Sequence, residues 1–459
     1  MKGKSCLFLT VLCLLLALTA CQDTTNPSPE SVDPVPEVTE PETPDPAPVE
    51  EPEEEPESER SQREQDWITD LNYLSQTYKS VHKDPFYLVS EEEFDWKIER
   101  LKAKVGQLSD EDMYFEIAAL VAGMGDIHTF VNAPQSLYDR QFPIGTQHFG
   151  DKLYLTFYLE GYEQFAPYLL HEIVAVNGID ITYLEQKAAS LNNPFSYWYS
   201  KENFWLNPIA FLDWAGCDYK EGYTIEFLND NCEVESVEVP VITPAVMQSG
   251  SRVRHENWDQ LLFKKYGNQA EYVYGENGGL VYLSLSSLYD ASSITEPFEA
   301  AIELIKSHPD CGKLVLDLRS LPGGMDVMLV WVRAYVQDLK DLSIGKVYVA
   351  AGGYSASAAI SCLASFKNDL GAVIIGEPTG QFTSFFAGTP GVYVLPNSQI
   401  SVHIAHFWYE AGTIGEEYYD EDGKLYPWES TILPDVYVYQ DIEDIRQGKD
   451  SVLEWVLAQ

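Results

Sequence analysis

Basic residues are scarce in this 459-residue chain, which has 29 lysines and arginines against 72 aspartates and glutamates. The formal net charge is −43. Without the two lysines near the N-terminus and the 14 acidic residues of the segment 22–59, the remaining residues 60–459 still carry −31. A field of this sign repels nucleic acid and anionic lipid, and no basic patch offsets it. We therefore expect no nucleic-acid partner.

Cysteine is also sparse, since only Cys217, Cys232, Cys311 and Cys362 follow Cys21. That density excludes a fold built on a disulfide framework. The spacing of Cys217 and Cys232 would allow a disulfide across a hairpin, and the sequence leaves that pairing open.

Metal-binding patterns are missing as well, because neither Cys-x-x-Cys nor His-Glu-x-x-His occurs. The pair His403 and His406 lies in a strand-like run (399–406), where its odd spacing sends the two rings to opposite faces. We interpret both histidines as structural and expect no metal and no cofactor.

The N-terminus has the pattern of an export signal. Lys2 and Lys4 precede an apolar run from Leu7 to Leu18, too short to span a bilayer comfortably, and no later run reaches 18 apolar residues. The run ends in Leu18-Thr19-Ala20-Cys21, which resembles the lipobox of bacterial lipoproteins. The resemblance implies that residues 1–20 are a signal peptide and that Cys21 carries a lipid on the extracytoplasmic face of the cell membrane. An ordinary secretory signal with a chance cysteine is the alternative.

Residues 21–62 read as a tether. The stretch 22–59 holds 10 of the 26 prolines and 14 acidic residues, with no lysine or arginine. Such a segment buries too little apolar surface to offset its ordering entropy, and its like charges extend it further. We expect a solvated spacer; an acidic segment that binds a partner is the alternative.

Residues 63–138 are predicted to form an N-terminal helical domain. Apolar residues recur at helical spacing, and Ser109 is placed to cap a third helix. That helix should end at Gly123-Met124-Gly125, directly before Asp126-Ile127-His128-Thr129. His128 is therefore expected on a turn, where catalytic groups are often found.

Residues 139–250 change to short strands, predicted at 153–158, 172–176, 223–227 and 234–241. The segment 172–181 reads as a strand, an Asn-Gly turn and a second strand. It is similar to the "I-x-x-I-N-G" strand of PDZ domains, although no carboxylate-binding loop of the usual type precedes it. We expect a degenerate, β-rich PDZ-like insert.

An aromatic segment interrupts this insert. Eight aromatic side chains lie in about twenty residues: Phe195, Tyr197, Trp198, Tyr199, Phe204, Trp205, Phe211 and Trp214. They could form a hydrophobic lid or an inter-domain core. They could also line a substrate groove, because aromatic side chains anchor peptides and sugars well.

Residues 251–459 alternate strands with helices, which predicts an α/β core with parallel strand pairs in a mixed sheet. Strands at 313–318, 346–351 and 372–375 each run into a loop that carries polar or small residues. Helices are predicted at 294–307, 326–337 and 356–367. The loops should share the carboxyl edge of the sheet, where α/β folds place their sites.

The loop after residues 346–351 offers an exposed nucleophile. It reads Gly352-Gly353-Tyr354-Ser355-Ala356-Ser357 and opens a helix. A helix N-terminus supplies free backbone N–H groups, and Gly323 and Gly324 could bring another N–H close. Acyl transfer needs such a hydroxyl and such donors for a developing oxyanion. The pattern favours a hydrolytic site.

The order of the motifs adds a family resemblance. "DLRSLPGG", "GGYSASAA" and "GEPTG" follow one another as in the core of the C-terminal-processing (tail-specific) serine peptidases. "AALVAGMGDIHTF" resembles an element of the tricorn-like branch, and so do the closing segments. The resemblance covers residues 67–459. It implies an α/β fold with α+β character: a helical bundle, a PDZ-like insert and a peptidase core resembling the ClpP/crotonase-like architecture.

The resemblance also implies roles. Ser357 matches the nucleophile, with Ser355 as the fallback, and the N–H groups of Gly324 and Ala358 match the oxyanion hole, with Gly323 as the neighbouring alternative. Phe382 stands where these peptidases carry a catalytic lysine, and the lysines that follow Ser357 (Lys367, Lys424 and Lys449) lie elsewhere.

In the tricorn-like branch a histidine is the base, and His128 fits that place. Glu429, ahead of Pro434-Asp435, is the best match for its acidic partner, while Ile127 replaces a supporting serine.

Three classes of function remain open. The first is a membrane-anchored serine peptidase that hydrolyses exported proteins or peptides. The second is a catalytically inactive peptide-binding lipoprotein on the same fold, an idea that the missing lysine and the altered "SLPGG" loop motivate. The third is an esterase-type hydrolase or a carbohydrate-binding protein, which only the aromatic segment suggests.

Overall fold

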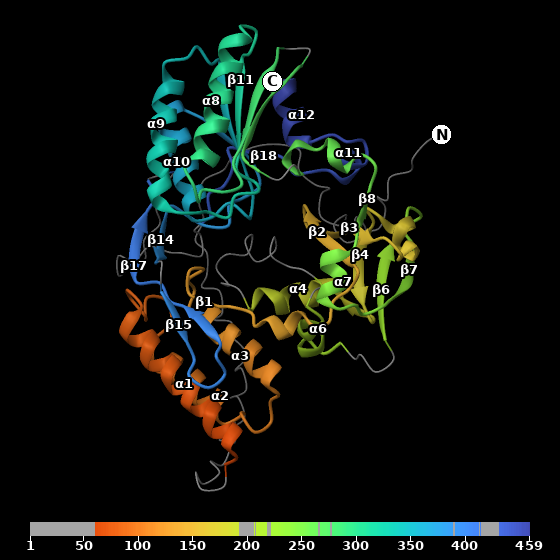
Figure 1. The fold of residues 1–459 in the computed structure, drawn as a ribbon, viewed down its shortest axis with the longest axis vertical. Coiled ribbons are helices and arrows are strands. Elements are labelled where there is room, and N and C mark those ends of the chain that lie inside the picture. The colour runs from red at the N-terminus through yellow and green to blue at the C-terminus, as the bar shows by residue number, and fades with distance from the viewer. Residues whose placement is uncertain are drawn as a thin grey trace, which may run out of the picture. The chain divides into compact units, whose positions relative to one another are not determined.

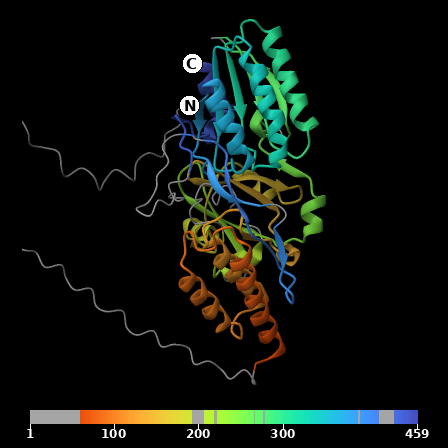
Figure 2. The ribbon, with the colours of Figure 1, turned by 90° about the vertical axis from the view of Figure 1, so that its left-hand side faces the viewer.

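The computed structural model describes residues 60–191, 206, 208–217, 222–264, 267–275, 278–388, 391–412, 414 and 431–459. The chain from Arg60 onwards is one compact unit, in which Figure 1 shows helices, a β-sheet region and an α/β region. Figure 2, a view at right angles, shows the N-terminal helices in orange at one end and the α/β region in green to blue at the other.

The first helices begin where serine caps them. They are α1 (Gln62–Val81), α2 (Glu91–Lys102) and α3 (Asp110–Ala122). The side chains of Ser61, Ser90 and Ser109 each accept a hydrogen bond from the backbone N–H three residues on. The predicted cap at Ser109 is therefore confirmed. The helical spacing predicts an apolar stripe on α1 that ends at Val81, which is half-buried, while the other four residues are buried: Trp67, Leu71, Leu74 and Tyr78.

A largely antiparallel sheet follows, in the order β2-β3-β4-β6-β7, with β5 on β4 and β8 on β3. Its strands are β2 (Ile144–Phe149), β3 (Lys152–Leu159), β4 (Glu172–Val176), β5 (Ile179–Asp180), β6 (Tyr223–Leu228), β7 (Val234–Val239) and β8 (Arg252–Arg254). Asn177 and Gly178 have φ of 49° and 73°, so they form the tight turn that the Asn-Gly pair predicted. The second strand is shorter than expected, because α4 (Ile181–Ala189) begins at Ile181, capped by Asp180.

The aromatic segment is described only in part. Phe195, Tyr197, Trp198, Tyr199, Phe204 and Trp205 lie outside the described residues. In α6 (Ile209–Trp214), Phe211 is buried, and the ring of Trp214 stacks on Phe115 of α3 at 5.1 Å. This part of the segment therefore belongs to the core between the helices and the sheet. The short helix α7 (Pro244–Ser249) precedes β8.

The α/β region is a mixed sheet in the order β18-β13-β12-β11-β10-β9. Only the pairing of β9 with β10 is antiparallel within the described residues. The strands are β9 (Gln269–Val273), β10 (Leu280–Ser284), β11 (Lys313–Asp317), β12 (Lys346–Ala351), β13 (Val373–Gly376) and β18 (Val436–Tyr437). The helices are α8 (Ser292–Ser307), α9 (Leu329–Lys340), α10 (Ala358–Leu370), α11 (Ile442–Arg446) and α12 (Ser451–Ala458).

Both faces of this sheet are covered, as expected for parallel strands. On β10, Val281 and Leu283 pack into the cluster of α8, α9 and α10, whereas the alternate residue Tyr282 packs with Val452 and Val456 of α12. The predicted α/β fold, with its helical region and PDZ-like region, is confirmed.

The chain returns to the N-terminal helices after β13. Strand β14 (Ser384–Ala387) pairs with β17 (Phe407–Glu410), and β15 (Val392–Val394) pairs with β16 (Ser401–His403). Strand β16 also pairs with β1 (Phe130–Val131), which follows His128 closely. Through this pairing, the segment that contains β15 and β16 lies beside the turn that holds His128. The ring of His403 stacks on Phe130 at 4.3 Å, in agreement with a structural role.

Cys217 is a buried free thiol, so the disulfide with Cys232 that the spacing allowed does not form.

Within the described ranges, no helix has the length and apolar character needed to cross a membrane. The same ranges contain no group of three or more histidine, cysteine or acidic side chains that could hold a metal ion.

Candidate active site

Ser357 occupies the turn between β12 and α10. Its φ of 54° and ψ of −124° lie in a region that side-chain-bearing residues rarely adopt. Such a conformation costs about 1–3 kcal/mol and persists only where surrounding contacts enforce it. The turn places the serine directly before Ala358, the first residue of α10, where helix N–H groups have no intrahelical acceptor.

Ser355, the fallback nucleophile, lies in the same loop but is completely buried. Its hydroxyl donates to the carbonyl of Leu318 at 2.8 Å and accepts from the N–H of Gly352 at 3.3 Å. These bonds tie the loop after β12 to the loop after β11. Ser355 is therefore a structural residue, and Ser357 is left as the candidate nucleophile.

Gly323 lies against this serine. A Cβ added at Gly323 would be 2.8 Å from the Cβ and 3.3 Å from the Oγ of Ser357, and the φ of Gly323 is 130°. Only glycine allows this backbone approach. Within the described part of the chain, the N–H groups of Gly324 and Ala358 donate no hydrogen bond. Both remain available to an anionic oxygen, as the oxyanion-hole prediction requires.

His128 reaches the same region from the turn after α3, with 21 % of its side chain exposed. Its ring stacks on Phe385 of β14 at 5.3 Å and 13°. The side chain of Gln381 lies between His128 and Ser357: its Oε1 accepts the N–H of Ser357 at 2.6 Å, and its Nε2 is 3.5 Å from Nδ1 of His128. Within the described chain, no hydrogen bond joins the Ser357 hydroxyl directly to the His128 ring. Gln381 therefore contacts both predicted residues, Ser357 and His128.

Asp126 fixes the turn that carries His128. Its Oδ1 accepts the backbone N–H of His128 at 2.9 Å, and its Oδ2 accepts the Thr129 hydroxyl at 2.6 Å. The Nε2 of His82 approaches the same Oδ2 at 3.4 Å. Nδ1 of His82 accepts the N–H of Asp84, so the Nε2 of a neutral His82 carries the proton and donates to Asp126. Asp126 is buried, and three donors compensate its charge.

Burial lowers the pKa of the His128 imidazole below its ordinary value. The negative charges of Asp126 and Asp326 and a hydrogen bond with the backbone of Phe386 act in the opposite direction and are outweighed. Asp326 begins the 3₁₀ turn Asp326–Met328 after Gly324, and burial raises the pKa of its carboxyl. His128 is therefore neutral at neutral pH and able to accept a proton.

Two predicted residues, Glu429 and Cys21, lie outside the described residues, as does Lys424. Lys367 is paired with Asp435 at 2.5 Å, and the amine of Lys449 donates to the side chain of Gln447. Within the described residues, no hydrogen bond or ion pair joins either lysine to Ser357. That histidine serves as the base stays a prediction.

Gln381, Asp126 and Asp326 were not predicted as site residues from the sequence. Asp126 stands in the "D-x-H-T" element, where its two-residue spacing to His128 could have suggested an Asx-type bond to the backbone. Gln381 is one residue before Phe382, the position that matches the family's lysine, and only the fold shows what its side chain contacts.

Comparison with known proteins shows that the fold of this chain is similar to that of solved structures. No protein-family model matches this chain, and neither does any curated protein sequence. The solved structure of mature CPAF complexed with lactacystin matches over 86 % of this chain and 97 % of its own, with 12 % identity and a TM-score of 0.55. A serine-to-alanine mutant of CPAF matches over 86 % and 96 %, with 12 % identity and a TM-score of 0.56. The photosystem II D1 C-terminal processing protease matches over 86 % and 99 %, with 12 % identity and a TM-score of 0.37. The fold of this chain is therefore that of the CPAF structures.

Proposed function

We propose that this chain is a serine peptidase of the C-terminal-processing family that hydrolyses peptide bonds of exported proteins or peptides. The observation that carries the proposal is the turn at Ser357. Ser357 adopts a strained conformation at the start of a helix and lies beside a glycine that admits no side chain. Gln381 contacts both this serine and the half-buried His128. The family resemblance of the motifs and the fold shared with CPAF support the same conclusion.

The reaction follows from these positions. His128 takes the proton of Ser357 as Oγ attacks the carbonyl carbon of the substrate. The N–H groups of Gly324 and Ala358 donate to the oxygen that becomes negative. The protonated His128 then returns the proton to the leaving amine, the C–N bond breaks, and an acyl-enzyme forms at Ser357. A water molecule, deprotonated by His128, hydrolyses the ester and restores the serine.

Glu429 completes the proposed Ser-His-Glu site as the acidic partner of His128. Asp126 and Asp326 already place negative charge near the ring, which stabilises the imidazolium that forms during the reaction.

A second candidate is a catalytically inactive protein that binds peptides on the same fold. The missing direct bond between Ser357 and His128 in the described chain favours it. Catalytic hydrogen bonds are often long in the absence of substrate, however, and tighten on binding, so the peptidase is the stronger proposal.

A fluorophosphonate probe separates the two candidates, because only an activated serine is phosphonylated at an appreciable rate. We expect labelling of the wild-type chain on the peptide that contains Ser357, and none of Ser357→Ala. Ser365→Ala is the matched control, since Ser365 lies on α10 and its hydroxyl donates to the carbonyl of Ser361. A wild-type chain that is folded, as shown by a cooperative thermal transition, and yet stays unlabelled would support the binding protein.

The proposed place of action is the extracytoplasmic face of the cell membrane, with a lipid on Cys21 as the anchor. Metabolic labelling with a palmitate analogue should mark the wild-type chain and Cys13→Ser, and leave Cys21→Ser unlabelled and released from the membrane fraction. Equal labelling of Cys21→Ser, with the chain still in the membrane fraction, would show that Cys21 is not the lipidated residue.

A further inference from the structure

Hydrogen bonds fix the backbone on which Gln381 lies. It lies between β13 and β14, and its side chain is buried. Its carbonyl accepts the hydroxyl of Thr379 at 2.7 Å, and the neighbouring Gly380 donates its N–H to the carbonyl of Ser355 at 3.0 Å. Thr379 is itself buried and accepts from the N–H of Ile432 at 2.9 Å. The backbone around Gln381 is therefore fixed to the same loop that carries Ser357.

The orientation of the Gln381 amide follows from its partners. The N–H of Ser357 can only donate, so the atom 2.6 Å from it must be the oxygen of the amide. The NH₂ group then points to Nδ1 of His128, at 3.5 Å. Because NH₂ can only donate, Nδ1 presents a lone pair and the ring proton of neutral His128 is on Nε2.

We infer that Gln381 is a positioning residue that presents Nδ1 of His128 as the proton acceptor and holds the backbone of Ser357 in its strained turn. The inference rests on the proposed peptidase function and adds which ring nitrogen acts and what selects it. At 3.5 Å the contact with Nδ1 is long and weak. The hydroxyl of Ser357 can therefore replace the amide as the donor to Nδ1. Both groups are donors, so the exchange leaves the tautomer unchanged.

The charges around His128 explain why an amide suits this position. Asp126 lies on the same turn, with Oδ1 3.9 Å from Nδ1, and Asp326 faces the ring from the segment after Gly324, next to Arg333. A third carboxylate in place of Gln381 would accept a hydrogen bond from Nδ1 and stabilise the imidazolium. The ring would then hold its proton at the nitrogen that must be free.

Substitutions of Gln381 test the inference in the full-length chain through the pH profile of kcat/KM. Gln381→Glu should move the acidic limb of the profile to higher pH by at least about one unit, which is a loss of about tenfold on that limb. Gln381→Leu should lower kcat by about tenfold or more and leave the limb where it is in the wild type. Gln141→Glu introduces the same charge at a residue that bonds to the carbonyl of Tyr138, and it should leave the profile unchanged.

The tautomer is a second readout, which does not depend on turnover. Selective ¹⁵N labelling of histidine should show Nδ1 of His128 unprotonated and Nε2 protonated near neutral pH, with the signal assigned by its loss in His128→Ala. A proton on Nδ1 in the wild type would overturn the inference, and so would a Gln381→Glu variant with an unmoved limb. A wild type without turnover would contradict the peptidase proposal, and the tautomer would still decide the placement of the proton.

Discussion

Ser357→Ala and His128→Ala are each expected to lower kcat/KM by about 10³-fold or more. The serine hydroxyl is a poor nucleophile without a base, and the base has no function without the hydroxyl. The two losses should therefore be similar, and the double variant should be little worse than either single one. Glu429→Gln should cost less, because nucleophile and base stay in place. Steady-state kinetics on a peptide substrate, with folding checked by thermal unfolding, measures all four.

The assignment of His128 as the base also predicts the direction in which kcat/KM changes with pH. His128 must be neutral to accept the proton, so kcat/KM rises with pH through its ionisation. Since burial lowers the pKa of His128, the rise should be centred below the ordinary histidine value of about 6.5, and activity should persist into mildly acidic solution.

His403→Ala is the matched control, because that ring stacks on Phe130, and it should keep activity within about twofold of the wild type. If His128→Ala stays active while Lys367→Ala is inactive, a Ser–Lys mechanism replaces this one.

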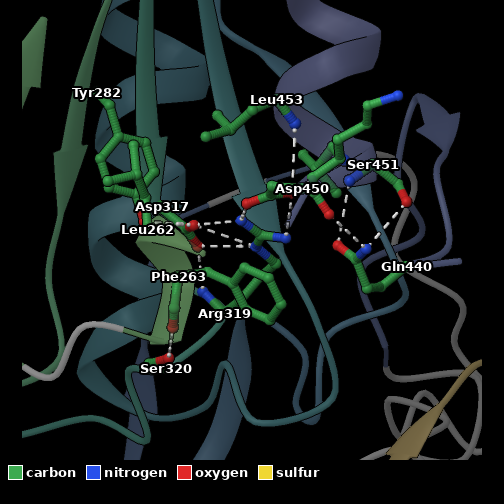
Figure 3. Close-up of polar contacts among 12 residues, drawn as sticks. Leu262, Phe263, Tyr282, Asp317, Arg319, Ser320, Gln440, Asp450, Ser451 and Leu453 are labelled. Carbon is green, nitrogen blue, oxygen red and sulfur yellow. Dashed lines mark hydrogen bonds and ion pairs between the residues drawn. The ribbon is translucent and has the colours of Figure 1, made fainter. Parts of the chain in front are cut away.

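Arg319→Met is expected to destabilise the fold by roughly 3–5 kcal/mol. Figure 3 shows the Arg319 guanidinium between two carboxylates, and its Nη2 is 2.5 Å from Asp317 and 2.7 Å from Asp450. All three side chains are almost wholly buried, and Tyr282 donates its hydroxyl to Asp317 at 2.8 Å. Methionine keeps much of the volume but leaves two buried carboxylates without a counter-ion. Chemical denaturation should show the loss as a lower midpoint with an unchanged slope.

The control for this loss is Lys340→Met, which breaks an exposed pair with Asp369 and should cost less than about 1 kcal/mol. Adding Asp450→Asn to Arg319→Met should recover part of the stability, because one of the two unpaired charges is removed. An Arg319→Met variant within about 1 kcal/mol of the wild type would mean that water reaches the cluster.

The local features of the fold could be predicted from the sequence. Strands β4 and β12 have the predicted bounds, because each is a short apolar run ended by a turn sequence. The cap of α3 and the turn at Asn177 follow from residues within four positions of each other. Helix α10 begins two residues later than predicted, since Ser357 adopts a conformation that no helix contains.

The contacts across the site could not be predicted in the same way. Ser355 and Ser357 stand in the same small-residue loop, and only the hydrogen bond from Ser355 to the distant carbonyl of Leu318 shows which hydroxyl is occupied. Gln381 contacts a residue 253 positions away, for which no local pattern exists. The pairing of β1 with β16 is equally non-local, and each of these strands is only two or three residues long.

The pairing of β1 with β16 affects when, during folding, the candidate active site is assembled. A contact between Phe130 and His403 closes a very long loop. Such contacts form late in folding, because the conformational entropy of the loop is lost before the contact stabilises the chain. If the chain is exported as proposed, the residues of β16 cross the membrane among the last sixty of the printed sequence. Until β16 pairs with β1, the proposed base His128 is not held beside the proposed nucleophile Ser357. A partly translocated molecule of the proposed peptidase should therefore not cleave its neighbours in the export machinery, and cutting should begin only once β16 has crossed and paired.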